Sequence, residues 1–197
     1  AHYARLPGCY RGGAHAGSAT RLRPVAERPS GGRRRRQRAH DAPELGEALE
    51  AAAHNANRRV WELSTEYPSQ AGMGTTLTAL ALCTDGARLV HIGDSRAYLL
   101  RDGALTQITA DHSLVAEMVR SGELLAEQAD AHPLRSVLSR ALGTEPEPII
   151  DVLDLDLSPG DVLLLCSDGL SGPVSADRIT ECLELDDPEQ AAGELVG

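Results

Sequence analysis

An α+β fold, with antiparallel sheets and helices in separate layers, is predicted from two observations on the sequence. Between residues 75 and 108, short apolar runs are separated by the turn pairs Asp85-Gly86 and Asp102-Gly103, which are strong signals of β-hairpins. Segments with the spacing of amphipathic helices stand before and after these runs, and residues 75–108 are expected to form an antiparallel meander. Antiparallel pairing with helical layers indicates an α+β sandwich rather than a parallel, doubly wound sheet.

The length and composition indicate one domain with a substantial core. The chain has 197 residues, and no apolar run approaches the 18 residues of a membrane span. The four cysteines have no paired metal spacing, which indicates thiols in a reducing compartment; they are Cys9, Cys83, Cys166 and Cys182. We therefore expect a monomeric, cytoplasmic protein without a signal peptide, which contacts neither membranes nor nucleic acid.

Charge divides the chain into two parts. Residues 1–40 hold ten arginines and one acid (+9), whereas residues 41–197 hold nine arginines and 28 acids (−19). Residues 1–40 show no helical or strand periodicity and are rich in Gly, Pro and Arg, which predicts disorder. The run "GGRRRRQR" leaves a nucleic-acid arm open as an alternative, although no aromatic residues are interleaved for base stacking. The predicted domain is therefore residues 41–197.

The first predicted helix covers residues 41–64. Asp41 is its expected N-cap, with Pro43 in the first turn and Glu44 three residues after the cap. Apolar residues then recur at spacings of three and four, which predicts one buried stripe composed of Leu45, Leu49, Ala52, Ala56, Val60 and Leu63.

The remaining elements follow from period and turns. Residues 112–142 return to helical spacing, interrupted at Gly122 and Pro133. Two further strands are expected between residues 148 and 166, with a turn over residues 158–161. Ser175 is a suitable cap for a helix over residues 175–185, and another helix starts near Pro188.

Two acids, Asp94 and Asp168, stand where apolar strands end beside small residues. Hard divalent cations bind several oxygen ligands from different chain segments held on rigid elements, so this pair is a candidate partial Mg²⁺ or Mn²⁺ site. The alternative is that both acids are turn residues that hydrogen-bond their own backbones.

Several motifs occur in an order that resembles the metal-dependent protein phosphatases of the 2C type (PP2C), in their bacterial single-domain form. They are "GMGTTLTAL", "VHIGDSRAYLLRDGALTQITADHS", "HPLRSVLSRALG" and "LSPGDVLLLCSDGLSGPV". The resemblance covers roughly residues 45–197. It implies two packed antiparallel sheets flanked by helices, a binuclear Mn²⁺/Mg²⁺ site, and hydrolysis of phosphoserine and phosphothreonine in proteins.

The resemblance also implies roles for individual residues. Asp168 of "SDG" matches a ligand of the central metal pair, and Asp94 of "GDSR" matches the acid that holds a third metal. Residues 112–148 correspond to the flap beside the active site, and His112 and His132 to flap positions. Phosphorylated proteins and Ser/Thr protein kinases are the implied partners.

The chain departs from the family pattern at both ends. No Asp-Gly-x-Gly-Gly-His motif, whose Asp bridges the metals, and no N-terminal phosphate-binding arginine motif are found, and the closing Asp-Asn segment is expected beyond Gly197. One central ligand remains, so weak metal binding and impaired activity are expected. Our hypothesis is that residues 1–40 are an out-of-frame translation; the alternative is a real basic arm on a diverged protein. A catalytically inactive phosphatase-like domain that binds phosphoproteins or kinases as a regulator is the alternative function.

Structural roles are predicted for the other polar residues. His91 is expected to be a satisfied core residue, and Arg96 to support its neighbours by hydrogen bonding. Asp111 is expected to cap the following helix. The acids of "DVLDLDL" (151–157) alternate with apolar residues and are interpreted as the solvated face of a strand.

Overall fold

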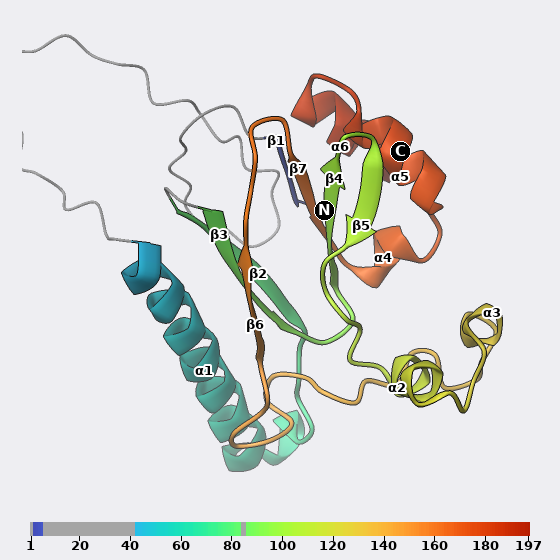
Figure 1. Ribbon diagram of the computed structural model, residues 1–197. Helices are drawn as coiled ribbons and strands as arrows, with labels where there is room; N and C mark the ends of the chain where they lie inside the picture. Colours follow the sequence, from blue (N-terminus) through green and yellow to red (C-terminus); the bar gives the residue numbers. More distant parts are fainter. Residues whose placement is uncertain (1, 6–41, 84–85) are drawn as a thin grey trace, which may run out of the picture.

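The computed structural model describes residues 2–5, 42–83 and 86–197 and contains two antiparallel sheets flanked by helices (Figure 1), as predicted. The four-stranded sheet has the order β1 (His2–Arg5), β7 (Val162–Cys166), β4 (Arg96–Arg101), β5 (Ala104–Gln107). The three-stranded sheet has the order β2 (Leu77–Cys83), β3 (Gly86–Ile92), β6 (Asp151–Leu155). The helices are α1 (Ala42–Glu66), the 3-10 turn η1 (Pro68–Gln70), α2 (Leu114–Ser121), α3 (Ala126–Ala129), α4 (Asp168–Ser171), α5 (Ala176–Leu183) and α6 (Pro188–Val196).

The strands between residues 75 and 108 form two hairpins in different sheets, so the prediction of one meander is wrong. β2 pairs with β3, and β4 pairs with β5, but β3 and β4 do not share a sheet. The chain leaves the first sheet at Gly93, whose φ of +113° strongly favours glycine, and enters the second at Arg96. Residues 93–95 therefore lie where the chain crosses from one sheet to the other.

Residues 2–5 form strand β1, although the sequence predicted no regular structure there. β1 pairs antiparallel with β7, with Tyr3 opposite Leu164. The backbone groups along this side of β7 would otherwise have no strand partner, and this pairing supplies one. The rest of the segment 1–40, with its predicted disorder and its out-of-frame hypothesis, and the predicted cap Asp41 lie outside the described residues.

Helix α1 covers β2 and β3, but the buried face differs from the predicted stripe. Of the predicted stripe, Leu49, Val60 and Leu63 are half-buried, but Leu45, Ala52 and Ala56 are exposed. The fully buried residues of the described part are Gly46, Ala53, Asn57 and Ser64. The face was missed because its members are small or polar. A Cβ on Gly46 would stand 2.5 Å from Cδ of Arg88, so glycine lets this long side chain lie against the helix.

Asn57 shows why a polar residue belongs on this face. Its side-chain oxygen accepts the N–H of Gly143 at 2.7 Å, and its amide nitrogen donates to the carbonyls of Glu145 and Pro146. These bonds give hydrogen-bond partners to backbone groups of a loop that is in neither a helix nor a sheet. Buried polar groups need such partners. Asn57 therefore fastens residues 143–146 to α1.

The segment after Pro133 is not helical, in contrast to the spacing-based prediction, while α2 and α3 form as expected. Instead it makes isolated β-bridges: Ser139 donates its N–H to the carbonyl of His112, and Leu142 exchanges two backbone hydrogen bonds with Thr75. Long-range backbone pairing therefore outweighs the local helical pattern. Figure 1 shows α2 and α3 standing apart from the two sheets.

The main hydrophobic cluster lies between the four-stranded sheet and the C-terminal helices. Alternate residues of β7 point to α5 and α6, as a strand's period of two requires. Its members include Val162, Leu164, Cys166, Ile179, Leu183 and Leu195. Leu163, between them on the opposite face, is also fully buried, so β7 is covered on both sides. Among the described helices, none is long and apolar enough to span a membrane.

The predicted cap at Ser175 is confirmed, and we expect Ser175→Ala to destabilise the fold by about 1 kcal/mol. The Ser175 hydroxyl oxygen accepts the N–H of Arg178 at 3.3 Å, and without it this N–H has no helical partner. Ser167→Ala is the matched control, because Ser167 is the N-cap of α4 and makes no side-chain cap bond. Urea unfolding measures both, and equal losses for the two variants would contradict the capping role.

Candidate functional site

Asp94 and Asp168 are brought to the same end of one strand pair. In the antiparallel ladder of β4 and β7, the last pair joins Arg96 and Cys166. Asp94 lies two residues before Arg96 and Asp168 two residues after Cys166, so both acids lie just beyond the same end of this strand pair. Asp168 is the first residue of α4 and is exposed, while Asp94 is half-buried in the crossing between the sheets.

The two carboxylates interact electrostatically. Burial raises the pKa of Asp94, and the negative charge of Asp168 raises it further. Repulsion between like charges in a partly desolvated place would be relieved by a cation that both carboxylates can reach. The arrangement therefore favours binding of a positive ion at this end of the sheet.

Arg96 supports its neighbours, as predicted, through a two-pronged ion pair. Its Nε donates to Oδ1 of Asp111 at 3.0 Å and its Nη2 to Oδ2 at 2.7 Å, while Nη1 contacts the Tyr98 hydroxyl. The carboxylate and the phenol together raise the pKa of Arg96, so its charge is permanent. The prediction that Asp111 caps α2 is wrong, because Ser113 is the N-cap and Asp111 is held by Arg96 and Gln107.

The turn that carries Asp94 is held by hydroxyl groups of β2 and of the residue before it. Thr76 Oγ1 and Ser95 Oγ lie 2.9 Å apart, and Thr78 Oγ1 lies 3.1 Å from the carbonyl oxygen of Ser95. A Cβ on Gly93 would stand 2.3 Å from Cγ2 of Thr76, so the turn lies directly against the residue before β2. The hydroxyl contacts of Ser95 thus fix the C-terminal side of Asp94, and Gly93 packs on Thr76 on its N-terminal side.

Two fully buried histidines pack beside this turn. The prediction for His91 is confirmed: Nδ1 lies 2.9 Å from the Thr78 hydroxyl and Nε2 lies 3.1 Å from the carbonyl oxygen of Ala110. The ring of His112 lies 4.7 Å from that of His91, centroid to centroid, at a tilt of 43°. Burial is the main cause that lowers the pKa of each histidine, so both rings favour the neutral form.

Asp151, predicted to be on a solvated strand face, instead joins this group. Its Oδ2 accepts from Nε2 of His112 at 3.0 Å, and its Oδ1 accepts from Nη1 of Arg140 at 2.8 Å. Hydrogen bonds from Arg140 and His112 hold the pKa of Asp151 below its usual value, against the opposing effect of burial. Sequence alternation could not reveal this role, because both partners come from the irregular flap. Asp154, in contrast, is exposed as predicted.

The described residues fit a single hard cation better than a binuclear centre. Asp94 and Asp168 provide two carboxylates whose repulsion a cation would relieve, and water could complete a coordination shell of oxygens. However, no group of three or more His, Cys, Asp or Glu side chains that could hold a metal ion occurs within residues 2–5, 42–83 and 86–197.

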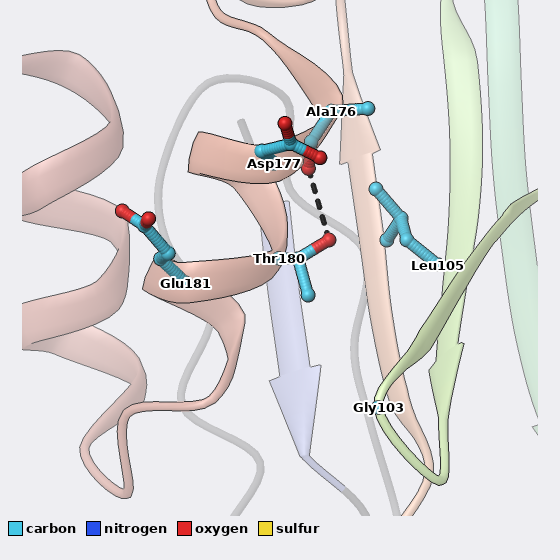
Figure 2. A pocket seen from close by; sticks show the side chains of 6 residues that line it. All are labelled: Gly103, Leu105, Ala176, Asp177, Thr180 and Glu181. Carbon is cyan, nitrogen blue, oxygen red and sulfur yellow. Dashed lines mark hydrogen bonds between the residues drawn. The ribbon is translucent and has the colours of Figure 1, made fainter.

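A shallow cleft of about 420 Å³ lies at the hairpin that follows β4, whereas Asp94 precedes the start of that strand (Figure 2). It is lined by Gly103 and Leu105 of the β4–β5 hairpin and by residues of α5, among them Asp177, Thr180 and Glu181. The Thr180 hydroxyl already donates to the Ala176 carbonyl, and Glu181 pairs with Arg178. The cleft therefore presents no buried polar group directed at a ligand.

Comparison with known proteins gives the family. The family model of protein phosphatase 2C matches residues 31–194. The chain belongs to the protein phosphatase 2C family. Among its relatives, the serine/threonine protein phosphatase PstP of Mycobacterium tuberculosis is 45% identical over 149 residues, and the serine/threonine phosphatase stp of Listeria monocytogenes is 38% identical over 143 residues.

Solved PP2C structures have the same fold. The crystal structure of PstP from Mycobacterium tuberculosis superposes with a TM-score of 0.70 at 44% identity, covering 80% of this chain and 67% of that one. Stp1 from Staphylococcus aureus gives 0.75 at 27% identity, covering 81% and 63%. This PP2C chain spans only part of the curated relatives, 29% of PstP and 57% of stp, while those alignments cover 75% and 73% of this chain.

Proposed function

We propose that this chain carries part of a PP2C phosphatase domain that hydrolyses phosphoserine and phosphothreonine in proteins. The observation that carries the proposal is the meeting of Asp94 and Asp168 at one end of the β4–β7 pair, where burial and then the charge of Asp168 raise the pKa of Asp94. Family membership supports the reaction, and a related structure, the catalytic domain of PstP, is described as a complex with two manganese ions.

In this proposal, the two carboxylates attract a hard divalent cation, with Mn²⁺ and Mg²⁺ as the candidates. A bound cation of this kind would supply activated water and neutralise charge on phosphoryl oxygens. The protein's own part is to hold Asp94 on a fixed turn and Asp168 on the first residue of α4. Arg96 is bound to Asp111 and Tyr98, so in this proposal it fixes the segment after Asp94.

The test is titration of the full chain with Mn²⁺, followed by calorimetry, together with hydrolysis of a phosphothreonine peptide. We expect a dissociation constant on the order of 10⁻³ M, because two carboxylates are few ligands for such an ion. Asp94→Asn and Asp168→Asn should each weaken binding at least about 10-fold. Asp154→Asn is the matched control, since this exposed carboxylate pairs with Arg88 and lies on the other sheet.

The outcomes separate the two candidate functions. Mn²⁺-dependent release of phosphate that both active-site substitutions reduce would support the phosphatase. Binding of the phosphopeptide without hydrolysis at any Mn²⁺ concentration would instead favour a phosphatase-like regulator. Equal Mn²⁺ binding by the Asp94→Asn, Asp168→Asn and Asp154→Asn variants would contradict the proposed site.

A further inference from the structure

His112 and Gly93 are joined by two hydrogen bonds in opposite directions. The backbone N–H of His112 donates to the carbonyl of Gly93 at 2.8 Å, and the backbone N–H of Gly93 donates to Nδ1 of the His112 ring at 3.1 Å. A backbone N–H is always a donor, so the Nδ1 atom that receives it carries no proton. In the neutral ring, the proton therefore resides on Nε2.

The orientation of the His112 ring is fixed from its other side. Nε2–H donates to Oδ2 of Asp151, whose Oδ1 is held by Arg140. Arg140 also donates to the carbonyl of Ile149 and so joins the flap to the start of β6. A carboxylate that receives a histidine N–H sets both the tautomer and the ring plane, as seen with the partners of metal-bound histidines.

Gly93 has no side chain with which to fix itself, and Asp94 follows it directly. On the far side of Asp94, Ser95 is held by Thr76 and Thr78. The N-terminal side of the turn depends on Gly93, whose N–H and carbonyl both bind His112. Removal of the His112 acceptor would leave a buried N–H unsatisfied and free that side to move.

From this geometry we propose that His112 is the positioning residue for Asp94: through Nδ1 it holds the Gly93 N–H, and through Nε2 it ties this turn to Asp151 and Arg140. The inference rests on the proposed function, in which Asp94 binds the cation. His112 touches neither cation nor substrate. It acts by keeping the Asp94 carboxylate half-buried and at the same end of the β4–β7 pair as Asp168.

Burial supports this role at neutral pH. The His112 ring is fully buried, and burial lowers its pKa, which keeps Nδ1 available as an acceptor. The groups that face the ring are His91 from β3, Asp151 from β6, Arg140 from the flap and Arg120 from α2. The arginines oppose protonation and Asp151 favours it, so the charges offset in part and burial dominates.

The first experiment uses the wild-type chain. Long-range ¹H–¹⁵N correlation spectra should show the Nε2–H tautomer of His112 at pH 7, and a through-hydrogen-bond coupling should join Nδ1 to the amide nitrogen of Gly93. A protonated Nδ1, or a missing coupling, would overturn the proposal. Because no substitution is involved, this result does not depend on the folding of any variant.

The second experiment compares two substitutions of His112, each of which keeps one of the two hydrogen bonds that the ring makes. His112→Asn places an oxygen acceptor where Nδ1 stands and loses the Asp151 bond. His112→Gln reaches Asp151 with its amide and loses the Gly93 bond. One readout is the pKa of the Asp94 carboxyl, measured by ¹³C NMR on the resonance that is absent in the Asp94→Asn variant. The other is the exchange rate of the Gly93 amide.

We expect His112→Gln to return the pKa of Asp94 toward the usual aspartate range and to speed Gly93 exchange at least about 10-fold. His112→Asn should keep the raised pKa of Asp94 and the slow exchange of the Gly93 amide. We expect this even though the loss of the Asp151 bond should lower its melting temperature. Equal behaviour of the two folded variants would overturn the proposal. Neither readout needs a metal, so failure of Mn²⁺ binding would count against the proposed function alone.

Discussion

Replacing Gly93 by alanine is expected to destabilise the fold by about 4 kcal/mol, because two costs add. The first cost is conformational, since a φ of +113° is strained for any residue with a Cβ, at about 1–3 kcal/mol. The second is steric, because the new methyl would stand 2.3 Å from Cγ2 of Thr76. Overpacking of this kind against β2 costs a further 1–3 kcal/mol or so.

Gly122→Ala is the matched control, because Gly122 also has a positive φ, +78°, but nothing lies within 4 Å of its Cβ position. This variant should lose only about 1–2 kcal/mol, the cost of a left-handed residue. Urea unfolding at pH 7 gives both values. Equal losses would show that the contact with Thr76 carries no energy and that the turn does not rest on β2.

A double substitution tests the cause more directly. Thr76→Gly removes both side-chain atoms closest to the new methyl, Cγ2 and Cβ. If the clash is responsible, Gly93→Ala should cost less in the Thr76→Gly background than alone, with a coupling energy of at least about 1 kcal/mol. Strict additivity would assign the whole loss to the backbone conformation.

Local signals predicted most of the strands and the cap at Ser175, because each is decided within a few residues. Asp-Gly pairs mark the β2–β3 and β4–β5 turns, and Ser175 caps α5 through a bond to Arg178, three residues away. The meander prediction failed at Gly93. An apolar strand that ends in glycine has the same sequence pattern whether the next strand joins the same sheet or another sheet. Which sheet a strand enters is decided by burial over the whole domain.

In the candidate site too, local sequence signals predicted some residues and missed those whose partners are distant in the sequence. Asp94 and Asp168 could be selected because each follows an apolar strand. Asp151 could not, because its partners His112 and Arg140 lie 39 and 11 residues away, in a segment whose helical spacing is overridden by β-bridges. Likewise, the buried face of α1 is made of Gly46, Ala53 and Asn57, whose burial depends on Arg88 and on the loop after Gly143.

The buried histidines should make the fold acid-sensitive well above the range where aspartates titrate. The folded pKa values of His91 and His112 lie below the unfolded value of about 6.5, so between these limits the unfolded chain binds more protons than the folded one. The unfolding free energy must then fall as the pH falls. Each histidine that stays neutral in the folded protein down to pH 5 lowers the unfolding free energy by up to about 2 kcal/mol between pH 7 and pH 5.

The aspartates change the unfolding free energy in other pH ranges or with the opposite sign. Asp151, Asp154 and Asp161 have folded pKa values below the unfolded value of about 3.9, so their contributions are lost only near and below pH 4. Asp94 has a raised pKa, so protonation of this carboxyl relieves a folded-state cost as the pH falls and opposes the histidine effect. Measurements in an Asp94→Asn background remove that opposing contribution.

In this background, urea unfolding is measured at half-unit steps from pH 7.5 to 5, with and without His91→Gln. Glutamine keeps a donor to the Ala110 carbonyl but cannot take up a proton in this range, so the unfolding free energy should fall less steeply, by up to about 2 kcal/mol over two pH units. His132→Gln is the control, since this flap histidine lies outside the buried pair. Parallel curves with and without His91 would mean that the folded protein takes up this proton as easily as the unfolded chain. A flattened curve would mean that His91 stays neutral in the folded protein as the pH falls, because burial disfavours its charged form.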